Sequence, residues 1–170
     1  MSHEDRSRRF DGLARRYGDD LYRFAVWLCR DPALAADLVQ ETYLRAWKAL
    51  DRLQDEGAAK SWLITILRRE FARTFERKVP PIDDIDDVVV AEPNEQGPDD
   101  RTERDRLRDA IARLDAMYRE PLALQVLLGL SIAEIAETLD LSESAVMTRV
   151  FRAREQLKAR LSNEPPGKRT

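Results

Sequence analysis

The chain has 170 residues, 43% hydrophobic and 36% charged, with a formal net charge of −3, which is typical of a soluble helical protein of one domain or two small ones. It contains no apolar run of membrane-spanning length and no signal-peptide pattern, so we expect a cytoplasmic protein. With a single cysteine, Cys29, the chain cannot form an internal disulfide. Its single histidine, His3, lies near an end expected to fray and excludes a histidine-based metal site or catalytic triad. No cofactor is expected.

The first predicted element is a helix over residues 5–30. Apolar side chains recur at helical spacing from Phe10 to Phe24, and we expect Gly18 to weaken or break the helix midway. Asp31 and Pro32 are an N-cap followed by proline at the first helical position. They predict a second helix that runs through Leu50.

This second helix has an apolar stripe and a polar outer face. The positions predicted to face inward are Ala35, Leu38, Val39, Ala46 and Leu50. Those predicted to face outward are Asp37, Gln40, Glu41, Leu44 and Lys48, with Trp47 at the border. An outward leucine near carboxylates and a tryptophan is typical of a partner surface. Ordinary scattered apolar surface residues explain the pattern equally well.

After a loop at residues 51–60, residues 61–78 predict a basic helix. Its face begins with Trp62 and continues with the arginine row Arg69, Arg73 and Arg77. Cations interleaved with aromatic rings suit nucleic acid, because phosphates attract the cations and bases stack on the rings. The alternative is that Trp62, Phe71 and Phe75 belong to the core and the arginines are simply solvated.

Residues 79–100 have the composition of a linker. They contain four prolines, one glycine and eight acidic residues, with no lysine or arginine. Elsewhere in the chain basic residues outnumber acidic ones by five, so the net charge conceals two mildly basic parts and an acidic linker.

Two further helices are predicted before residue 130. Residues 101–118 form the first, with Leu107, Ile111 and Leu114 facing inward. Glu120 and Pro121 start the second, an apolar helix that packs in the middle of a small bundle and ends at Gly129 as a C-cap. Residues 163–170 are expected to be a frayed polar tail.

Residues 130–161 predict two helices joined by a tight turn. Ser131 and Glu134 have capping-box spacing, Asp140 and Leu141 form the turn, and Ser142 caps the second helix. The predicted inward stripe of the second helix is Val146, Val150, Ala153 and Leu157. The side chains predicted to point away from the core are Ser144, Thr148, Phe151 and Arg152.

The second helix of this pair is also basic, with cations at Arg149, Arg152, Arg154, Lys158 and Arg160 against the anions Glu143 and Glu155. A short turn before a helix with a small-polar and basic outer face is the arrangement that places a recognition helix in a DNA major groove. An αα-hairpin with solvated charges remains the alternative.

Three blocks of the chain resemble the extracytoplasmic-function sigma factors of bacterial RNA polymerase. DLVQETYLRAWKALDRL resembles the region 2 helix that docks on the polymerase clamp, and KSWLITILRREFARTFERK resembles the promoter-melting segment. RLDAMYREPLALQVLLGLSIAEIAETLDLSESAVMTRVFRAREQL resembles region 4, including its EIA and RAR signatures. Order, spacing and the linker between them agree with the family.

The resemblance implies an all-α fold of two small helical domains. Residues 1–78 would be the region 2 domain, 79–100 the acidic linker, 101–162 the region 4 helix-turn-helix domain and 163–170 a disordered tail. Region 2 would bind core RNA polymerase and open the −10 element, region 4 would sit on the polymerase flap and read the −35 duplex, and the linker would pass through the RNA channel. The protein would be a specificity subunit of transcription initiation and not an enzyme.

The resemblance also implies three sets of site residues. Contacts with the polymerase clamp would come from Asp37, Gln40, Glu41 and Arg45. The unstacked −10 strand would be surrounded by Leu53, Gln54, Lys60, Trp62, Arg69 and Arg73. The −35 base edges would face Ser144, Met147, Thr148, Phe151 and Arg152, with Arg149, Arg154 and Lys158 nearer phosphates.

Two positions depart from the family pattern. Arg69 stands where the family often has asparagine, which favours a phosphate or guanine contact over an amide's reading of adenine. Met147 stands where lysine or arginine is frequent, which removes a cation and offers an apolar contact. The common promoter consensus of the family therefore does not transfer to this chain.

Two other functions can be weighed against the same residues, which also predict one regulatory partner. A stand-alone helix-turn-helix regulator would explain the C-terminal half but leaves the first domain without a task. A helical-bundle enzyme would need Glu-x-x-His ligand pairs, a nucleophile–base set or a phosphate loop, none of which the sequence offers. Two apolar and basic DNA faces joined by a linker predict an anti-sigma factor that covers both.

Overall fold

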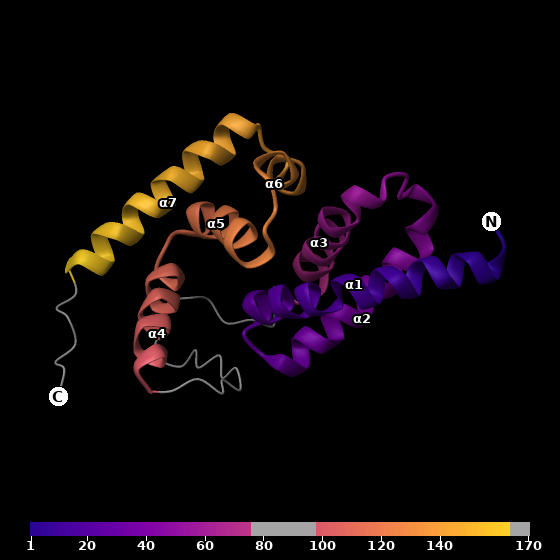
Figure 1. Cartoon of the computed structure of the whole chain (residues 1–170), viewed down its shortest axis with the longest axis horizontal. Helices are drawn as coiled ribbons and strands as arrows, with labels where there is room; N and C mark the ends of the chain where they lie inside the picture. Colours follow the sequence, from indigo (N-terminus) through magenta and orange to yellow (C-terminus); the bar gives the residue numbers. More distant parts are fainter. Residues whose placement is uncertain (76–97, 164–170) are drawn as a thin grey trace. The chain divides into compact units, whose positions relative to one another are not determined.

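The computed structural model describes residues 1–75 and 98–163, and within these ranges every regular element is helical (Figure 1). Contacts between Cα atoms divide the chain into two compact units, Met1–Ala91 and Glu92–Thr170. In the described ranges no helix combines the length and the apolar character that crossing a bilayer requires.

The N-terminal unit begins with α1, His3–Cys29, which starts two residues before the predicted position. Ser2 and Asp5 form a capping box, in which the Ser2 hydroxyl accepts from the Asp5 N–H at 3.2 Å. His3, expected at a frayed end, lies in the first turn with its ring edge-on to Trp47, 6.0 Å between centroids. The prediction of fraying at this end was wrong because the capping box satisfies the first backbone donors.

Helix α1 also continues through Gly18 without a break. A Cβ atom at Gly18 would stand 3.0 Å from the hydroxyl oxygen of Tyr43, so the missing side chain allows α2 to pack closely. The expected break was wrong because this glycine serves packing between the two helices. Burial and the nearby Asp19 carboxylate raise the pKa of Tyr43.

Helix α2, Pro32–Ala49, begins as predicted, with the Asp31 carboxylate accepting from the Ala33 N–H at 2.8 Å. Two single 3₁₀ turns follow, η1 at Leu50–Arg52 and η2 at Glu56–Ala58, and they lead into α3, Ala59–Glu70. A π-helical turn, η3, continues α3 over Phe71–Phe75. The predicted inward stripe is confirmed, because Ala35, Leu38, Val39 and Ala46 of α2 and Leu50 of η1 are all buried.

In the C-terminal unit the predicted helix over residues 101–118 is divided in two. Helix α4, Pro98–Ala112, starts inside the expected linker, at a proline followed by two aspartates, residues that favour a first helical turn. Helix α5, Ala116–Leu128, contains Pro121 in its second turn, so that the prediction of a start at Glu120 and Pro121 was wrong. Arg119 of α5 donates to the carbonyl oxygen of Ala112 at 3.1 Å and so satisfies the last turn of α4.

Burial along α4 and α5 agrees only in part with the predicted pattern. Leu114 is buried and Ile111 half-buried, but Leu107 is 42% exposed, so its inward assignment was wrong. Gly129 ends α5 as predicted, with a left-handed φ of 64°. Leu122, Leu124 and Leu128 of α5 are buried, as expected of a helix that packs against both α6 and α7.

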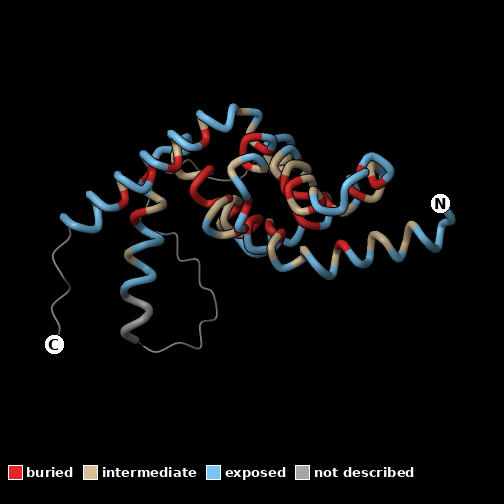
Figure 2. The backbone as a smooth tube through the Cα atoms, turned by 45° about the horizontal axis from the view of Figure 1, so that its top comes forward, coloured by how far each residue is buried: buried red, intermediate tan, exposed pale blue. Residues whose placement is uncertain are grey.

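Helices α6, Ile132–Leu139, and α7, Glu143–Asn163, form the predicted pair. The capping box is present, with the Ser131 N–H donating to Glu134 at 2.8 Å and the Glu134 N–H donating to the Ser131 hydroxyl at 3.1 Å. Asp140 adopts the left-handed conformation, φ 55°, in the turn, and the Ser142 hydroxyl accepts from the Ala145 N–H. Buried positions recur along one side of α7 and confirm the predicted stripe Val146, Val150, Ala153 and Leu157 (Figure 2).

Candidate nucleic-acid interface

The outer face of α7 carries two large apolar side chains among polar and basic ones. Phe151 is 65% exposed and Met147 is 54% exposed, although both lie one position from buried residues of the same helix. Ser144, Thr148 and Arg152 are exposed on the same helix. Exposing an apolar side chain of this size to water costs free energy. The place of Met147 and Phe151 among hydroxyl and guanidinium groups suits a surface that contacts base edges.

Several other cations of α7 have partners within the C-terminal unit. Arg154 donates to the Gln125 side-chain oxygen of α5 at 2.7 Å, and Arg160 donates to the carbonyl oxygen of Arg113 at 3.3 Å. Lys158 lies 3.9 Å from Glu155, and Arg149 is half-buried. Arg152 is exposed on the outer face, while Arg154 also connects α7 with α5 through Gln125.

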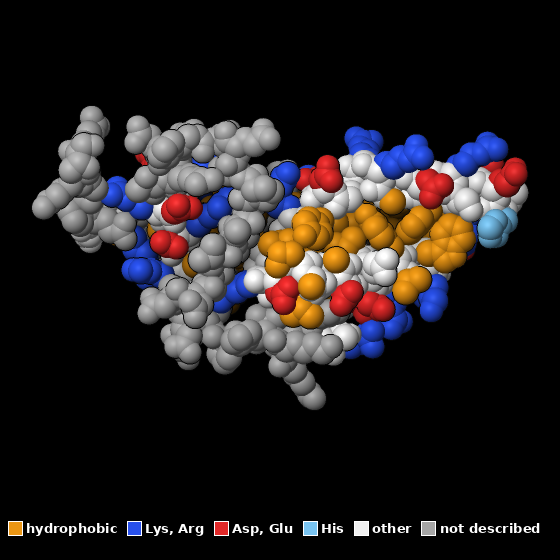
Figure 3. Space-filling model, turned by 90° about the horizontal axis from the view of Figure 1, so that it is seen from below, with side chains coloured by type: hydrophobic (Ala, Val, Ile, Leu, Met, Phe, Trp, Pro, Cys, Tyr) orange, Lys and Arg blue, Asp and Glu red, His pale blue; other side chains and the backbone are white. Residues whose placement is uncertain are grey.

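In the N-terminal unit the outer face of α2 is as predicted. Asp37 and Gln40 are exposed, Glu41 is half-buried and Leu44 is 55% exposed. Figure 3 shows hydrophobic side chains gathered in a band across this unit, with acidic and basic side chains along its borders. The exposed Leu44 side chain, among polar and acidic neighbours on α2, is a suitable contact for a protein partner.

The carboxylate of Glu70 connects α2 with the end of α3. It is only 6% exposed, and its oxygens lie 3.1 Å from Nε of Arg45 and 2.8 Å from Nη2 of Arg73. The hydrogen bond and the charge of Glu70 raise the pKa of Arg73, and the charge of Glu41 adds to the effect. The resemblance assigned Arg45 to the polymerase and Arg73 to DNA, and the structure brings the two side chains together on one buried acid.

The residues expected around an unstacked −10 strand are not all at the surface. Gln54 and Arg69 are exposed, Trp62 is half-buried, and Lys60 forms an ion pair with Asp20 at 3.4 Å. Leu53 is 4% exposed and packs in a core cluster with Leu13, Leu50 and Ala59, against which Trp62 also lies. The Leu53 side chain therefore supports the loop from within and does not face solvent. The core alternative for Trp62 is thus partly correct, and the side chains of Phe75 and Arg77 lie outside the described residues.

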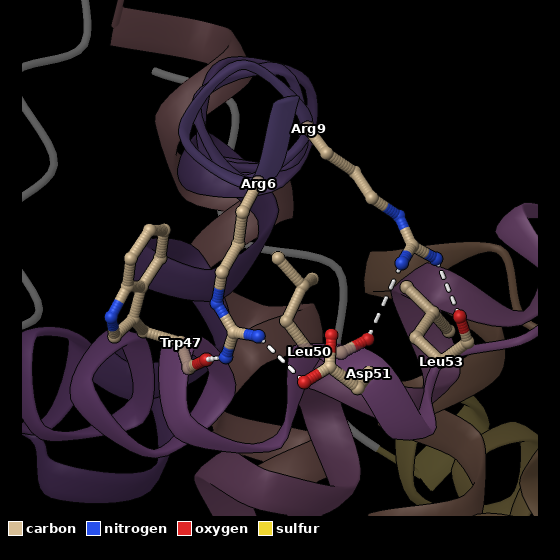
Figure 4. A network of polar contacts seen from close by, with 6 residues as sticks. All are labelled: Arg6, Arg9, Trp47, Leu50, Asp51 and Leu53. Carbon is tan, nitrogen blue, oxygen red and sulfur yellow. Dashed lines mark hydrogen bonds and ion pairs between the residues drawn. The ribbon is translucent and has the colours of Figure 1, made fainter. Parts of the chain in front are cut away.

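Two arginines of α1 that no sequence pattern singled out hold the connection between α2 and α3 (Figure 4). Arg6 donates to Asp51 at 2.6 Å and to the carbonyl oxygen of Trp47, whose ring lies 5.0 Å from the guanidinium carbon. Arg9 donates to the carbonyl oxygens of Leu50 and Leu53. The partners are more than 40 residues away in the chain, so no local pattern could have indicated them.

These features define a class of protein. A helix-turn-helix with an exposed, partly apolar and basic outer face, in a chain whose other unit has arginines on its last described helix, is the architecture of a DNA-binding transcription protein of the helix-turn-helix class. Among the described residues no group of three or more histidine, cysteine, aspartate or glutamate side chains is placed to hold a metal ion.

Comparison with known proteins identifies the family. Residues 13–79 match the family model for sigma-70 region 2, and residues 104–157 match that for sigma-70 region 4. The chain is 30% identical over 152 residues to the ECF RNA polymerase sigma factor SigM of Bacillus subtilis, covering 88% of this chain and 93% of SigM. It is 34% identical over 148 residues to the ECF RNA polymerase sigma factor SigL of Mycobacterium tuberculosis, covering 83% of this chain and 82% of SigL.

Solved structures agree with this relationship. The sigma factor RpoE from Bartonella quintana, in complex with the anti-sigma factor NepR, superposes with a TM-score of 0.71 at 28% identity, covering 92% of this chain and 98% of RpoE. CnrH in complex with the cytosolic domain of CnrY gives a TM-score of 0.67 at 28% identity, covering 94% of this chain and 91% of CnrH. The chain belongs to the extracytoplasmic-function family of sigma factors. It is an alternative sigma factor that directs transcription, and the reading as a stand-alone regulator is not favoured.

Proposed function

We propose that the chain binds core RNA polymerase and divides promoter recognition between its two units. The C-terminal unit reads the −35 element as duplex, and the N-terminal unit opens the −10 element and holds its unstacked strand. The observation that carries the proposal is the outer face of α7, where Met147, Phe151 and Arg152 are exposed above a buried stripe.

The −35 contacts follow from the chemistry of that face. Arg152 has the planar donor pair that suits O6 and N7 of guanine, and Met147 and Phe151 offer apolar contact to a thymine methyl group. Ser144 and Thr148 can donate to or accept from base edges. Arg149, Arg154 and Lys158 contact phosphates, where Arg154 can keep its bond to Gln125 and still present further N–H donors.

The −10 contacts come from the surface between η1 and the end of α3. Gln54, Lys60, Arg69 and Arg73 provide polar and cationic groups, and the half-buried ring of Trp62 provides a face on which a base can stack. Unstacking a base costs a few kcal/mol, which stacking and hydrogen bonds at this surface must offset. Leu53 keeps these groups in place from the core side.

Core polymerase binds the outer face of α2 in this proposal. Asp37, Gln40, Glu41 and Arg45 supply polar contacts around the exposed Leu44 side chain. The chemistry of RNA synthesis then belongs to the polymerase, and this chain is a specificity subunit of the cytoplasm without catalytic residues of its own.

We also propose that an anti-sigma factor controls this chain. Two of the solved relatives are in complex with a partner, RpoE with the anti-sigma factor NepR and CnrH with the cytosolic domain of CnrY. The exposed apolar side chains Leu44 and Phe151 are surfaces that such a partner can cover. Recovery of polymerase alone in pull-downs from unstressed cells would count against this regulator.

Reconstitution with core polymerase tests the proposal. The holoenzyme should bind promoter duplex, and permanganate should modify unpaired thymines at the −10 element of the bound promoter. Arg69→Ala should reduce this modification more than it reduces duplex binding. A chain that never joins core polymerase and still binds promoter duplex tightly alone would be a regulator and not a sigma factor.

A further inference from the structure

All three guanidinium nitrogens of Arg9, in α1, donate hydrogen bonds to the segment between α2 and α3. Nη2 donates to the carbonyl oxygen of Leu53, Nη1 donates to that of Leu50 at 3.4 Å, and Nε donates to Oε1 of Glu56 at 2.6 Å (Figure 4 shows the two carbonyl contacts). The Arg9 side chain is 23% exposed. Three acceptors on one short segment are more than a single surface ion pair would involve.

Two of these acceptors flank Gln54. Leu53 directly precedes it, and Glu56 follows two residues later. Between them the Asp55 carboxylate accepts from the Gly57 N–H at 2.8 Å, which fixes the start of η2. Arg9 therefore holds the backbone directly before Gln54 and, through the Glu56 side chain, the residues after it. The Gln54 side chain itself is exposed to solvent.

The remaining contacts of the segment do not replace Arg9. Arg6 contacts only the start of the segment, at Asp51, and the carbonyl oxygen of Trp47 before it. The core cluster holds the side chains of Leu50, Leu53 and Ala59 but none of residues 54–58. An amide can select a base only from a fixed position, and ordering a free loop at the moment of binding reduces affinity and selectivity.

We propose that Arg9 is a positioning residue for reading the −10 element: it holds residues 50–56 so that Gln54 meets an unstacked base in one conformation. Arg9 itself touches no base. The inference rests on the proposed role of Gln54 at the −10 strand, and its test must separate the two.

The test measures base selectivity of the holoenzyme. Single-stranded oligonucleotides carrying the non-template −10 sequence of a mapped promoter are substituted at each position in turn, and their affinities are measured by fluorescence anisotropy. The position at which Gln54→Ala loses discrimination identifies the base read by Gln54. At that position Arg9→Ala should reduce the ratio of matched to mismatched affinity by about three- to tenfold, the loss expected when one side chain must be ordered on binding.

Two further variants complete the design. Glu56→Ala removes one anchor from an exposed position and should reduce the same ratio to a smaller extent. Arg8→Ala is the matched control, because Arg8 is a neighbouring cation of α1 that pairs with Glu4 at 3.7 Å and not with the loop. It should leave the ratio unchanged, and all variants should keep their affinity for core polymerase and for −35 duplex.

Three other outcomes are possible, and each would overturn the positioning role of Arg9, the −10 role of Gln54, or both. An equal fall of Arg9→Ala affinity for matched and mismatched oligonucleotides would show a role in folding alone and overturn the positioning role. Full discrimination in Arg9→Ala, with discrimination lost in Gln54→Ala, would overturn the positioning role and leave the proposed −10 contact intact. Unchanged discrimination in Gln54→Ala would overturn the −10 role of Gln54 and with it the inference.

Discussion

The carboxylate of Glu70, at the end of α3, lies 3.1 Å from Nε of Arg45 on α2, and it is almost fully buried. This ion pair joins the helix proposed to meet polymerase to the helix proposed to meet the −10 strand. A buried carboxylate that accepts from arginine loses charge-assisted hydrogen bonds when it is neutralised.

Glu70→Gln should therefore lower the free energy of unfolding of the N-terminal unit by about 1–3 kcal/mol. Urea unfolding followed by tryptophan fluorescence reports this unit, because Trp27, Trp47 and Trp62 all lie in it. Glu4→Gln is the control: Glu4 is 85% exposed in its pair with Arg8, and its loss should cost less than about 1 kcal/mol. Equal effects of the two substitutions would contradict a structural role for the buried acid.

We predict that position 18 requires glycine only because the Tyr43 hydroxyl lies close to it. Gly18→Ala in the wild-type chain should give little or no stabilisation, since the gain in helix propensity is offset by a contact of 3.0 Å with the Tyr43 oxygen. In a Tyr43→Phe background the same change should stabilise the protein by about 0.5–1 kcal/mol. Gly12→Ala, on the same helix with no atom within 4 Å, should show that gain in the wild-type chain. Thermal or urea unfolding of the four variants checks this, and a full gain from Gly18→Ala alone would contradict the packing role.

Local patterns in the sequence were sufficient to predict those helix ends that are fixed by residues nearby in the chain. The Asp31–Pro32 start of α2, the Ser131–Glu134 capping box of α6 and the Gly129 end of α5 depend on residues within four positions, and all three are confirmed. The division between α4 and α5 was missed because its stabilising contact comes from Arg119, seven residues after Ala112. The support of the −10 loop by Arg6 and Arg9 was missed because it depends on the packing of α1, which no local spacing encodes.

Cys29 should be unreactive in the folded protein near neutral pH. It is 2% exposed, and burial, with a smaller effect of the Asp31 charge, raises the pKa of its thiol to about 11. Since the folded state holds this proton more tightly than the unfolded state, Cys29 contributes stability below pH 9 that is lost as the pH rises through about 11. Reaction with a thiol-specific disulfide reagent at pH 7.5 should be slow in buffer and fast in urea, and equal rates would contradict burial of the thiol.

Arg152 and Lys158 of α7 should differ in the kind of binding that they contribute. Arg152→Ala should weaken −35 binding by about 1–3 kcal/mol and relax the preference at one base position. Lys158→Ala should weaken binding to all sequences alike and reduce its salt dependence, because a phosphate contact carries no base information. Affinities of the holoenzyme for a set of singly substituted −35 duplexes provide the measurement. An equal loss on every duplex for Arg152→Ala would remove it from the base-reading set.

The division of promoter recognition between two units is tested most directly by mapping transcript starts made by the reconstituted holoenzyme on a library of promoters randomised in both elements. The wild-type protein should select two sequence elements at a fixed spacing. Arg152→Ala should relax selection in the −35 element alone, and Arg69→Ala should act at the −10 element alone. Selection of a single element, or the same change of selection by both substitutions, would contradict the account.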